Sequence, residues 1–349
     1  MIIDVHGHYT TAPAELQAYR GRQVNSMGRP TKGRLNISDD QICETLEKGQ
    51  LQKQRERGTD VAIFSPIAAA MGHHFGNELT SRYWAEVNNE LIYRACKLYP
   101  QQFIGACQLP QSPGVSPANC VEELERCVKE FGFVGCNLNP DPSGGYWTAP
   151  PLGDEWWYPL YEKLVELQVP ALIHVAAACN PAFHTTGSHY INGDTTAIMQ
   201  LAESRVYEDF PTLTFIIPHG GGAVPYQMAR YRAINILAGR ESFDDFAKRL
   251  YFDTAIYNQD AMETLIKAVG VDNVLFASEM IGAANAIDPE TGRWFDDNKP
   301  YLDAISWLTD ADRQKIFEDN AKKAYPRLQH QLELQHQNAA ATGPAAAGR

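Results

Sequence analysis

The 349-residue chain lacks the features of several protein classes. It has no apolar run near the roughly 20 residues that a membrane-spanning helix needs, and its seven cysteines never form a Cys-x-x-Cys pair. Lysine and arginine number 30 against 42 aspartate and glutamate residues, which gives a formal net charge of −12. These absences argue against a membrane protein, a disulfide or zinc-knuckle scaffold and a nucleic-acid-binding protein.

The opening segment, Met-Ile-Ile-Asp-Val-His, lacks the basic start and longer apolar run of a signal peptide. The odd number and scattered positions of the cysteines are typical of reduced thiols. We therefore expect a cytoplasmic protein without disulfides.

One stretch, residues 20–34, departs from the acidic character of the chain because it contains no aspartate or glutamate. A positive segment on an acidic protein attracts anions by its charge. We therefore expect a small anionic partner. The basic residues are Arg20, Arg22, Arg29, Lys32 and Arg34.

Short apolar runs rich in β-branched residues alternate with longer amphipathic segments along the chain. This alternation predicts a parallel sheet covered by helices. Eight repeats favour a closed (β/α)8 TIM barrel over an open sheet, which is the alternative if the runs are miscounted. The expected strands are 2–5, 60–65, 103–109, 133–138, 171–175, 213–217, 250–253 and 274–277, and the expected helices are 38–57, 77–99, 116–131, 155–167, 195–209, 224–237, 260–269 and 310–325.

Two long connections interrupt this rhythm, and the end of the chain departs from it. Residues 9–37 and 280–300 follow the first and the last expected strand, at the end where barrels place their active sites. We expect both to act as lid loops. Residues 329–349 are rich in glutamine and alanine, so we expect one barrel domain over 1–328 followed by a disordered tail.

Metal-ligating residue types stand at the ends of four expected strands. His6 and His8 alternate on the first strand, so both imidazoles face the same way. His174, His219 and Glu279 end the fifth, sixth and eighth strands. A single histidine in such a place is usually a core residue, but convergence at one barrel mouth favours a metal site. Nitrogen and oxygen ligands suit Zn2+, with Mn2+ or Fe2+ as alternatives.

Six short motifs carry a family resemblance that extends along almost the whole chain. They lie at residues 4–8, 136–142, 173–174, 216–226, 278–279 and 287–292. On these motifs the chain resembles the amidohydrolase superfamily, in the branch that contains aminocarboxymuconate semialdehyde decarboxylase. Within that branch it is most similar to the 4-oxalomesaconate hydratases and to the C–C hydrolases of aromatic meta-cleavage products.

The resemblance implies one divalent metal, because the bridging lysine of dinuclear members is absent from residues 135–139. His6, His8, His174 and Glu279 are the implied metal ligands. Glu279 replaces the aspartate of most relatives, and its longer side chain serves as a ligand, a proton acceptor or both. His219 is the implied proton shuttle or polariser of a substrate carbonyl.

The same resemblance suggests substrate contacts and also a change in specificity. Tyr190 and Arg230 match the substrate contacts of the family, against a simpler interpretation as a packed aromatic and a solvated helix charge. His74 is a weaker candidate. Ile67 and Asn285 stand where the hydratases have arginine, so Asn285 is a candidate contact and the substrate is expected to differ.

The implied function is that of a lyase: hydration of the C=C bond of a carboxylated, conjugated keto-acid from aromatic catabolism. Hydrolytic C–C cleavage of a meta-cleavage product and non-oxidative decarboxylation are the enzymatic alternatives. A catalytically silent metal-binding scaffold is the alternative from another class. The expected partner is thus a small carboxylate, and a homo-oligomer, either a dimer or a tetramer, is expected.

Overall fold

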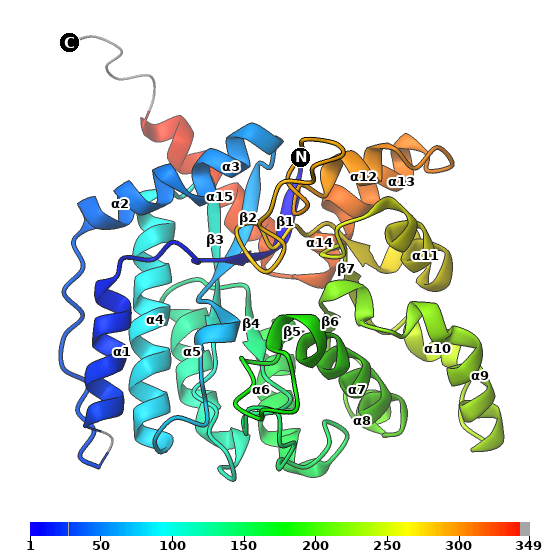
Figure 1. Ribbon diagram of the computed structural model, residues 1–349, viewed down its shortest axis with the longest axis horizontal. Helices are drawn as coiled ribbons and strands as arrows, with labels where there is room; N and C mark the ends of the chain where they lie inside the picture. Colours follow the sequence, from blue (N-terminus) through cyan, green and yellow to red (C-terminus); the bar gives the residue numbers. More distant parts are fainter. Residues whose placement is uncertain (27, 343–349) are drawn as a thin grey trace.

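Eight parallel strands form a barrel in the computed structural model, which describes residues 1–26 and 28–342 (Figure 1). The strands pair in chain order from β1 to β8. The Val5 amide donates to the Phe276 carbonyl over 3.0 Å, which joins the two edges of the sheet. The strands are β1 (Ile3–His8), β2 (Val61–Ser65), β3 (Phe103–Gln108), β4 (Gly135–Leu138), β5 (Ala171–Ile173), β6 (Phe215–Ile217), β7 (Tyr251–Asp253) and β8 (Val274–Leu275).

Helices surround the strands and cover the outside of the barrel (Figure 1). This is the (β/α)8 architecture that the sequence predicts. The helices are α1 (Glu15–Asn25), α2 (Asp39–Lys48), α3 (Gln50–Arg57), α4 (Glu78–Leu98), α5 (Val121–Lys129), α6 (Tyr158–Leu167), α7 (Tyr190–Ala202), α8 (Val206–Asp209), α9 (Met228–Leu237), α10 (Phe243–Ala247), α11 (Gln259–Val269), α12 (Lys299–Asp303), α13 (Asp310–Gln314), α14 (Asn320–Ala324) and α15 (Leu328–Thr342). None of the helices in the described residues is long and apolar enough to cross a bilayer.

The core has two parts because successive residues of a strand face opposite sides of the sheet. On β2, Val61 and Ile63 pack with other strand residues in the interior of the barrel. Ala62 and Phe64 instead face the surrounding helices. Burying a side chain such as Phe64 stabilises the fold by about 1.5–3 kcal/mol. The strand ends that form the barrel mouth are therefore supported by this core.

The two long connections have structure of their own, and the lid role expected of them stays a prediction. Residues 9–37 include α1, which packs beside α4. Lys32 in this stretch pairs with Glu86 and Glu90 at 2.9 and 2.8 Å, so part of the basic segment is neutralised. In the second connection, Asp296 accepts from Arg57 at 2.7 Å, which ties it to α3.

The end of the described chain differs from the expected disordered tail. Residues 328–342 form α15, and Leu328 and Leu332 are buried against the barrel interior cluster. Their spacing of four residues places both on one helix face, which gives this segment an apolar side to pack. The rest of the expected tail, 343–349, lies outside the described residues.

Candidate metal centre and active site

Three histidines and a glutamate meet at the C-terminal ends of the strands. The ligand atoms of His6, His174, His219 and Glu279 all lie within 4.8 Å of one another, and all four residues are buried. His8 joins them, because its Nε2 atom lies 3.1 Å from Nε2 of His6. The structure therefore brings together all five residues that the sequence places at the mouth.

Each imidazole is oriented by an acceptor at Nδ1. His6 Nδ1 donates to Asp253 Oδ2 over 2.7 Å, and His219 Nδ1 donates to Asp194 Oδ2 over 2.9 Å. His174 Nδ1 donates to the Val175 carbonyl over 2.7 Å. At His6 and His174, a proton held at Nδ1 leaves the lone pair of Nε2 free for a metal, which is the arrangement that outer partners create in metal sites.

His8 follows the same pattern through a hydroxyl. Its Nδ1 lies 2.8 Å from Oγ of Ser65, which also accepts from the Asn137 amide over 3.0 Å. The Ser65 hydroxyl proton points to a backbone carbonyl, either Gly7 or Pro66. The hydroxyl oxygen therefore accepts from His8, and Nε2 of His8 also carries a lone pair.

These lone pairs are unfavourable unless a cation is bound. Nε2 of His6 and Nε2 of His8 face each other across 3.1 Å, and Nε2 of His174 is buried without a hydrogen-bond partner. Unpaired buried polar atoms cost about 1–3 kcal/mol each. Two nitrogens bound to one zinc ion at about 2.0–2.1 Å lie about 3 Å apart. The donor set therefore fits a divalent metal.

The electrostatics of the site favour the neutral form of two histidines, His8 and His174. Burial, followed by the charge of His6, lowers the pKa of His8 to about 3. Burial and the charge of His219 hold the pKa of His174 well below its usual range. Neutral imidazoles of this kind are the metal-binding form.

His219 and Glu279 form the charged pair of the site. Burial lowers the pKa of His219, but the charges of Asp194 and Glu279 and the hydrogen bond to Asp194 outweigh it and raise that pKa well above its usual range. Burial raises the pKa of Glu279, but His219 outweighs it and holds that pKa well below the ordinary value. Nε2 of His219 lies 3.9 Å from Oε2 of Glu279. A proton donor and a proton acceptor thus stand side by side.

The backbone is strained at this site. His219, Tyr257 and Glu279 have φ angles of 49°, 60° and 48°, in the left-handed region that non-glycine residues avoid. Each such residue costs on the order of 1–3 kcal/mol, and such strain concentrates at functional sites. Tyr257 also donates its hydroxyl proton to Oε2 of Glu279. The fold therefore holds His219 and Glu279 at the centre in backbone conformations that are unfavourable for these residues.

Sequence reasoning missed four residues that position the site, and one of them is Ser65, which ends β2 and orients His8. Asp253 ends β7, and a carboxylate at a strand end is the signal that would have found it. Asp194 lies within α7, just before the expected helix start at residue 195. Tyr257 follows β7 in a loop, and no sequence pattern points to it.

The structure places the four predicted substrate contacts at different distances from the candidate metal centre. The Tyr190 ring stacks on the His219 ring with centroids 5.7 Å apart and lies 5.3 Å from the His174 ring. His74 lies on the loop after β2, and neither of its ring nitrogens has a partner. Arg230 and Asn285 are exposed, and Arg230 donates only to the Gln227 side chain. The structure brings Tyr190 to the candidate metal centre and leaves Arg230 and Asn285 at the surface.

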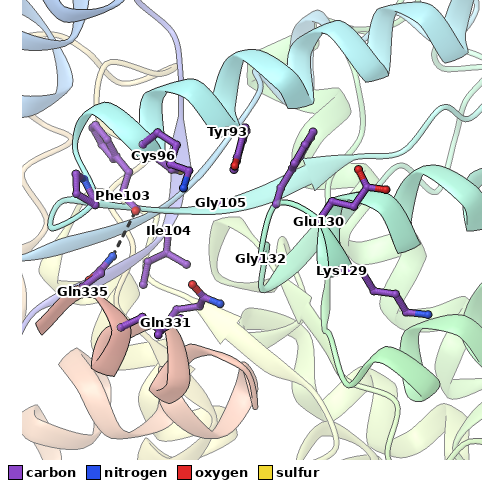
Figure 2. A pocket seen from close by; sticks show the side chains of 14 residues that line it. Tyr93, Cys96, Phe103, Ile104, Gly105, Lys129, Glu130, Gly132, Gln331 and Gln335 are labelled. Carbon is purple, nitrogen blue, oxygen red and sulfur yellow. Dashed lines mark hydrogen bonds between the residues drawn. The ribbon is translucent and has the colours of Figure 1, made fainter. Parts of the chain in front are cut away.

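A separate hollow lies at the opposite end of the barrel and is not this site. Figure 2 shows its lining, including Tyr93, Phe103 and Gln331, with the Gln335 amide donating to the Phe103 carbonyl. Its volume is about 330 Å³. Phe103 begins β3, whereas active sites of such barrels lie where strands end.

A (β/α)8 barrel with histidines and a carboxylate converging at the strand ends defines a class, the metal-dependent barrel enzymes. Residues 3–327 match the family model described as amidohydrolase, so the chain belongs to the amidohydrolase family. It is 48% identical over 335 residues to a 2-keto-4-carboxy-3-hexenedioate hydratase of Sphingobium sp. strain SYK-6, covering 95% of this chain and 98% of that one.

Two solved structures are also similar to this chain. A 4-oxalomesaconate hydratase from Rhodopseudomonas palustris is 48% identical, with a TM-score of 0.89, covering 97% of this chain and 99% of that one. A dihydroxybenzoic acid decarboxylase from Polaromonas sp. JS666, solved with bound manganese, is 22% identical with a TM-score of 0.69, covering 93% and 96%. At that identity the second likeness supports the fold alone.

Proposed function

We propose that this protein is a metal-dependent hydratase of the 4-oxalomesaconate hydratase type, acting in aromatic catabolism on a carboxylated keto-acid with a conjugated C=C bond. The observation that carries the proposal is the 48% identity to a hydratase over nearly the full length of both chains. The buried histidines and glutamate at the mouth supply groups that the reaction needs.

The reaction places defined demands on the site. Water adds its oxygen to the carbon β to the keto group, and a proton is delivered to the α carbon. Negative charge develops on the keto oxygen before that proton arrives. The site must therefore accept a proton from water, stabilise an enolate and return a proton to carbon.

We assign metal binding to His6, His8, His174 and Glu279, with His219 as the proton carrier. A bound divalent metal would supply Lewis acidity, which lowers the pKa of water and polarises an oxygen. Zinc is the proposed ion, with manganese or iron as alternatives. His219 holds a proton at Nε2, close to Oε2 of Glu279, so the two side chains can exchange it. Tyr190 stacks beside His219 and narrows the space for substrate.

The proposed substrate is a small carboxylate, and the proposed assembly is a homo-oligomer. Tyr226, Ile236 and Leu237 support the assembly, because they are 82%, 78% and 88% exposed at and before α9. Exposed apolar side chains of this size are typical of surfaces that meet a second subunit, and Ile236 and Leu237 are neighbours at the end of α9.

The test is incubation of the metal-loaded protein with 4-oxalomesaconate, with related carboxylated muconates and with ring-cleavage products, followed by mass spectrometry. A gain of 18 mass units is the expected result. Loss of 44 units would assign a decarboxylase, as the 27% identical gamma-resorcylate decarboxylase of Polaromonas sp. suggests. Scission into two acids would assign a C–C hydrolase. Either result would overturn the hydratase proposal, and so would the absence of any reaction.

A further inference from the structure

Arg20 carries a buried charge without a counterion in the described part of the chain. Its side chain belongs to α1, and the residue is 8% exposed. Nη2 donates to the carbonyls of Met71 and Gly72 over 3.1 and 3.0 Å, whereas Nη1 is buried without a partner. Burial lowers the pKa of Arg20 to about 10, so the guanidinium stays charged at neutral pH. Buried charges in proteins are normally paired.

Two aromatic rings complete the surroundings of this guanidinium. Its Cζ atom lies 4.8 Å from the Trp84 ring centroid and 5.6 Å from that of Phe75. Cation–π contacts of this kind stabilise a cation by about 0.5–2 kcal/mol. They hold the guanidinium in place but leave its charge uncompensated.

The guanidinium lies at the active-site end of the barrel. Met71 and Gly72 belong to the loop after β2, and strand ends at this side carry the histidine cluster. The same loop continues into His73, which is fixed by Asn139 over 2.9 Å and by the Leu109 carbonyl over 3.3 Å. His74, the next residue, has no partner at either ring nitrogen.

Arg20 and His74 are close enough to affect each other. Burial lowers the pKa of His74, and the positive charge of Arg20 lowers it further. A neutral imidazole has one N–H donor free at this place. Gly144, after β4, approaches closely, since a Cβ atom there would lie 2.7 Å from Nδ1 of His74. The loops after β2 and β4 therefore meet at His74. The buried carboxylate of Asp141 on the second loop accepts from the amides of Ser143, Gly145 and Trp147, and Nη1 of Arg20 is left without an acceptor.

We propose that Arg20 and His74 form a carboxylate subsite at the active-site end of the barrel, which binds a carboxylate of the substrate remote from the reacting carbons. This inference rests on the proposed function, because it assigns a role within the same substrate site. A carboxylate bound there supplies the missing counterion and accepts from Nη1.

A purely structural role for Arg20, linking α1 to the loop after β2, makes a different prediction. In that case its removal loosens the loop but leaves no defect in carboxylate binding once the protein is folded and metal-loaded. Ligand binding therefore separates the two roles better than turnover does.

The experiment is calorimetric titration of the zinc-loaded full chain with tricarballylate, an unreactive tricarboxylate. Arg20→Met is expected to weaken binding at least tenfold, because a charge-assisted hydrogen bond is lost. Arg20→Lys is expected to fall between this variant and the wild type. Arg205→Met removes an exposed arginine paired with Glu208 on the surface and is expected to change affinity less than twofold.

His74→Gln tests the subsite from the loop side and is expected to weaken binding about three- to tenfold. This variant still tests the subsite if Arg20→Met does not fold. Unchanged tricarballylate affinity in the folded Arg20 and His74 variants would overturn the subsite, as would loss of zinc from Arg20→Met. A protein that binds tricarballylate through Arg20 but adds no water to keto-acids would instead contradict only the proposed function.

Discussion

At the scale of single residues, the acceptor at each Nδ1 explains why the histidines act as a group. Asp253, Asp194, Ser65 and the Val175 carbonyl each fix one ring. The strand-end histidines could be predicted from the sequence because strand ends meet at one mouth. Their partners mostly could not, because Asp194 comes from a helix and its contact depends on how α7 packs.

Removal of one imidazole should empty the metal site. His174→Ala and His6→Ala are expected to reduce bound metal from about one equivalent per chain to less than a tenth, because each ring supplies one ligand nitrogen. Metal content after dialysis, measured by plasma mass spectrometry, checks this. His184→Ala is the control, since His184 is exposed and bonds locally to the Gly187 amide. Full occupancy in both ligand variants would contradict the assignment.

Loss of the charge of Asp194 should impair proton transfer more than substrate binding. Asp194→Asn is expected to lower kcat about a hundredfold, within the range for general acid–base groups, with KM changed less than threefold. The pKa of His219 falls when that negative charge is removed. The high-pH limb of the activity profile, where the His219 proton is lost, should therefore move to lower pH. A profile that keeps its position would argue against His219 as the proton carrier.

At the scale of elements, the strands were easier to predict than the helices. The expected strand 103–109 agrees closely with β3 because apolar runs and pairing coincide there. The expected helix 38–57 is divided into α2 and α3 at Gly49, whose close neighbours Thr11 and Thr45 leave no room for a Cβ atom. α7 begins at Tyr190 rather than at residue 195 because a helical turn at residues 185–189 leads into it. Such tertiary contacts leave little trace in sequence periodicity.

The turn after β6 should be intolerant of side chains. Gly222 has a φ angle of 61°, and a Cβ atom there would lie 2.5 Å from the Ile191 carbonyl oxygen. Gly222→Ala is expected to lower the free energy of unfolding by about 2–4 kcal/mol, which combines left-handed strain with a clash. Gly239→Ala is the control, with a φ angle of 65° and no atom within 4 Å, and is expected to cost about 1 kcal/mol. Equal urea midpoints for the two variants would contradict this.

At the scale of the whole molecule, the candidate centre joins distant parts of the chain. His6 lies on β1, and Glu279 follows β8, so a bound metal would connect both edges of the sheet. The barrel could be predicted from eight strand–helix repeats, because that count closes a parallel sheet. The packing of α15 could not, since its glutamine- and alanine-rich sequence gives a weak apolar pattern.

Metal removal should therefore destabilise the entire barrel. A ligand that binds only the folded state stabilises it by about 2.7 kcal/mol when present at a hundred times its Kd. Chelation is expected to lower Tm by several degrees, and one equivalent of zinc should restore it. Calorimetry of the wild type against His174→Ala gives the comparison, because that variant should not respond to zinc. If chelation leaves the Tm of the wild type unchanged, the protein holds no resident metal.

The separation of His6 and Glu279 in the chain also sets an order of events during biosynthesis. Roughly 270 residues must be translated between them, which takes about 15–55 s at about 5–20 residues per second. During that interval His6 and His8 are available to cellular cations without the carboxylate that completes their site. The nascent chain would thus hold a metal only weakly until β8 has been translated and the Val5 amide donates to the Phe276 carbonyl. If the proposed metal site is correct, metal selection would be a late step, made by a nearly finished barrel rather than by its first strand.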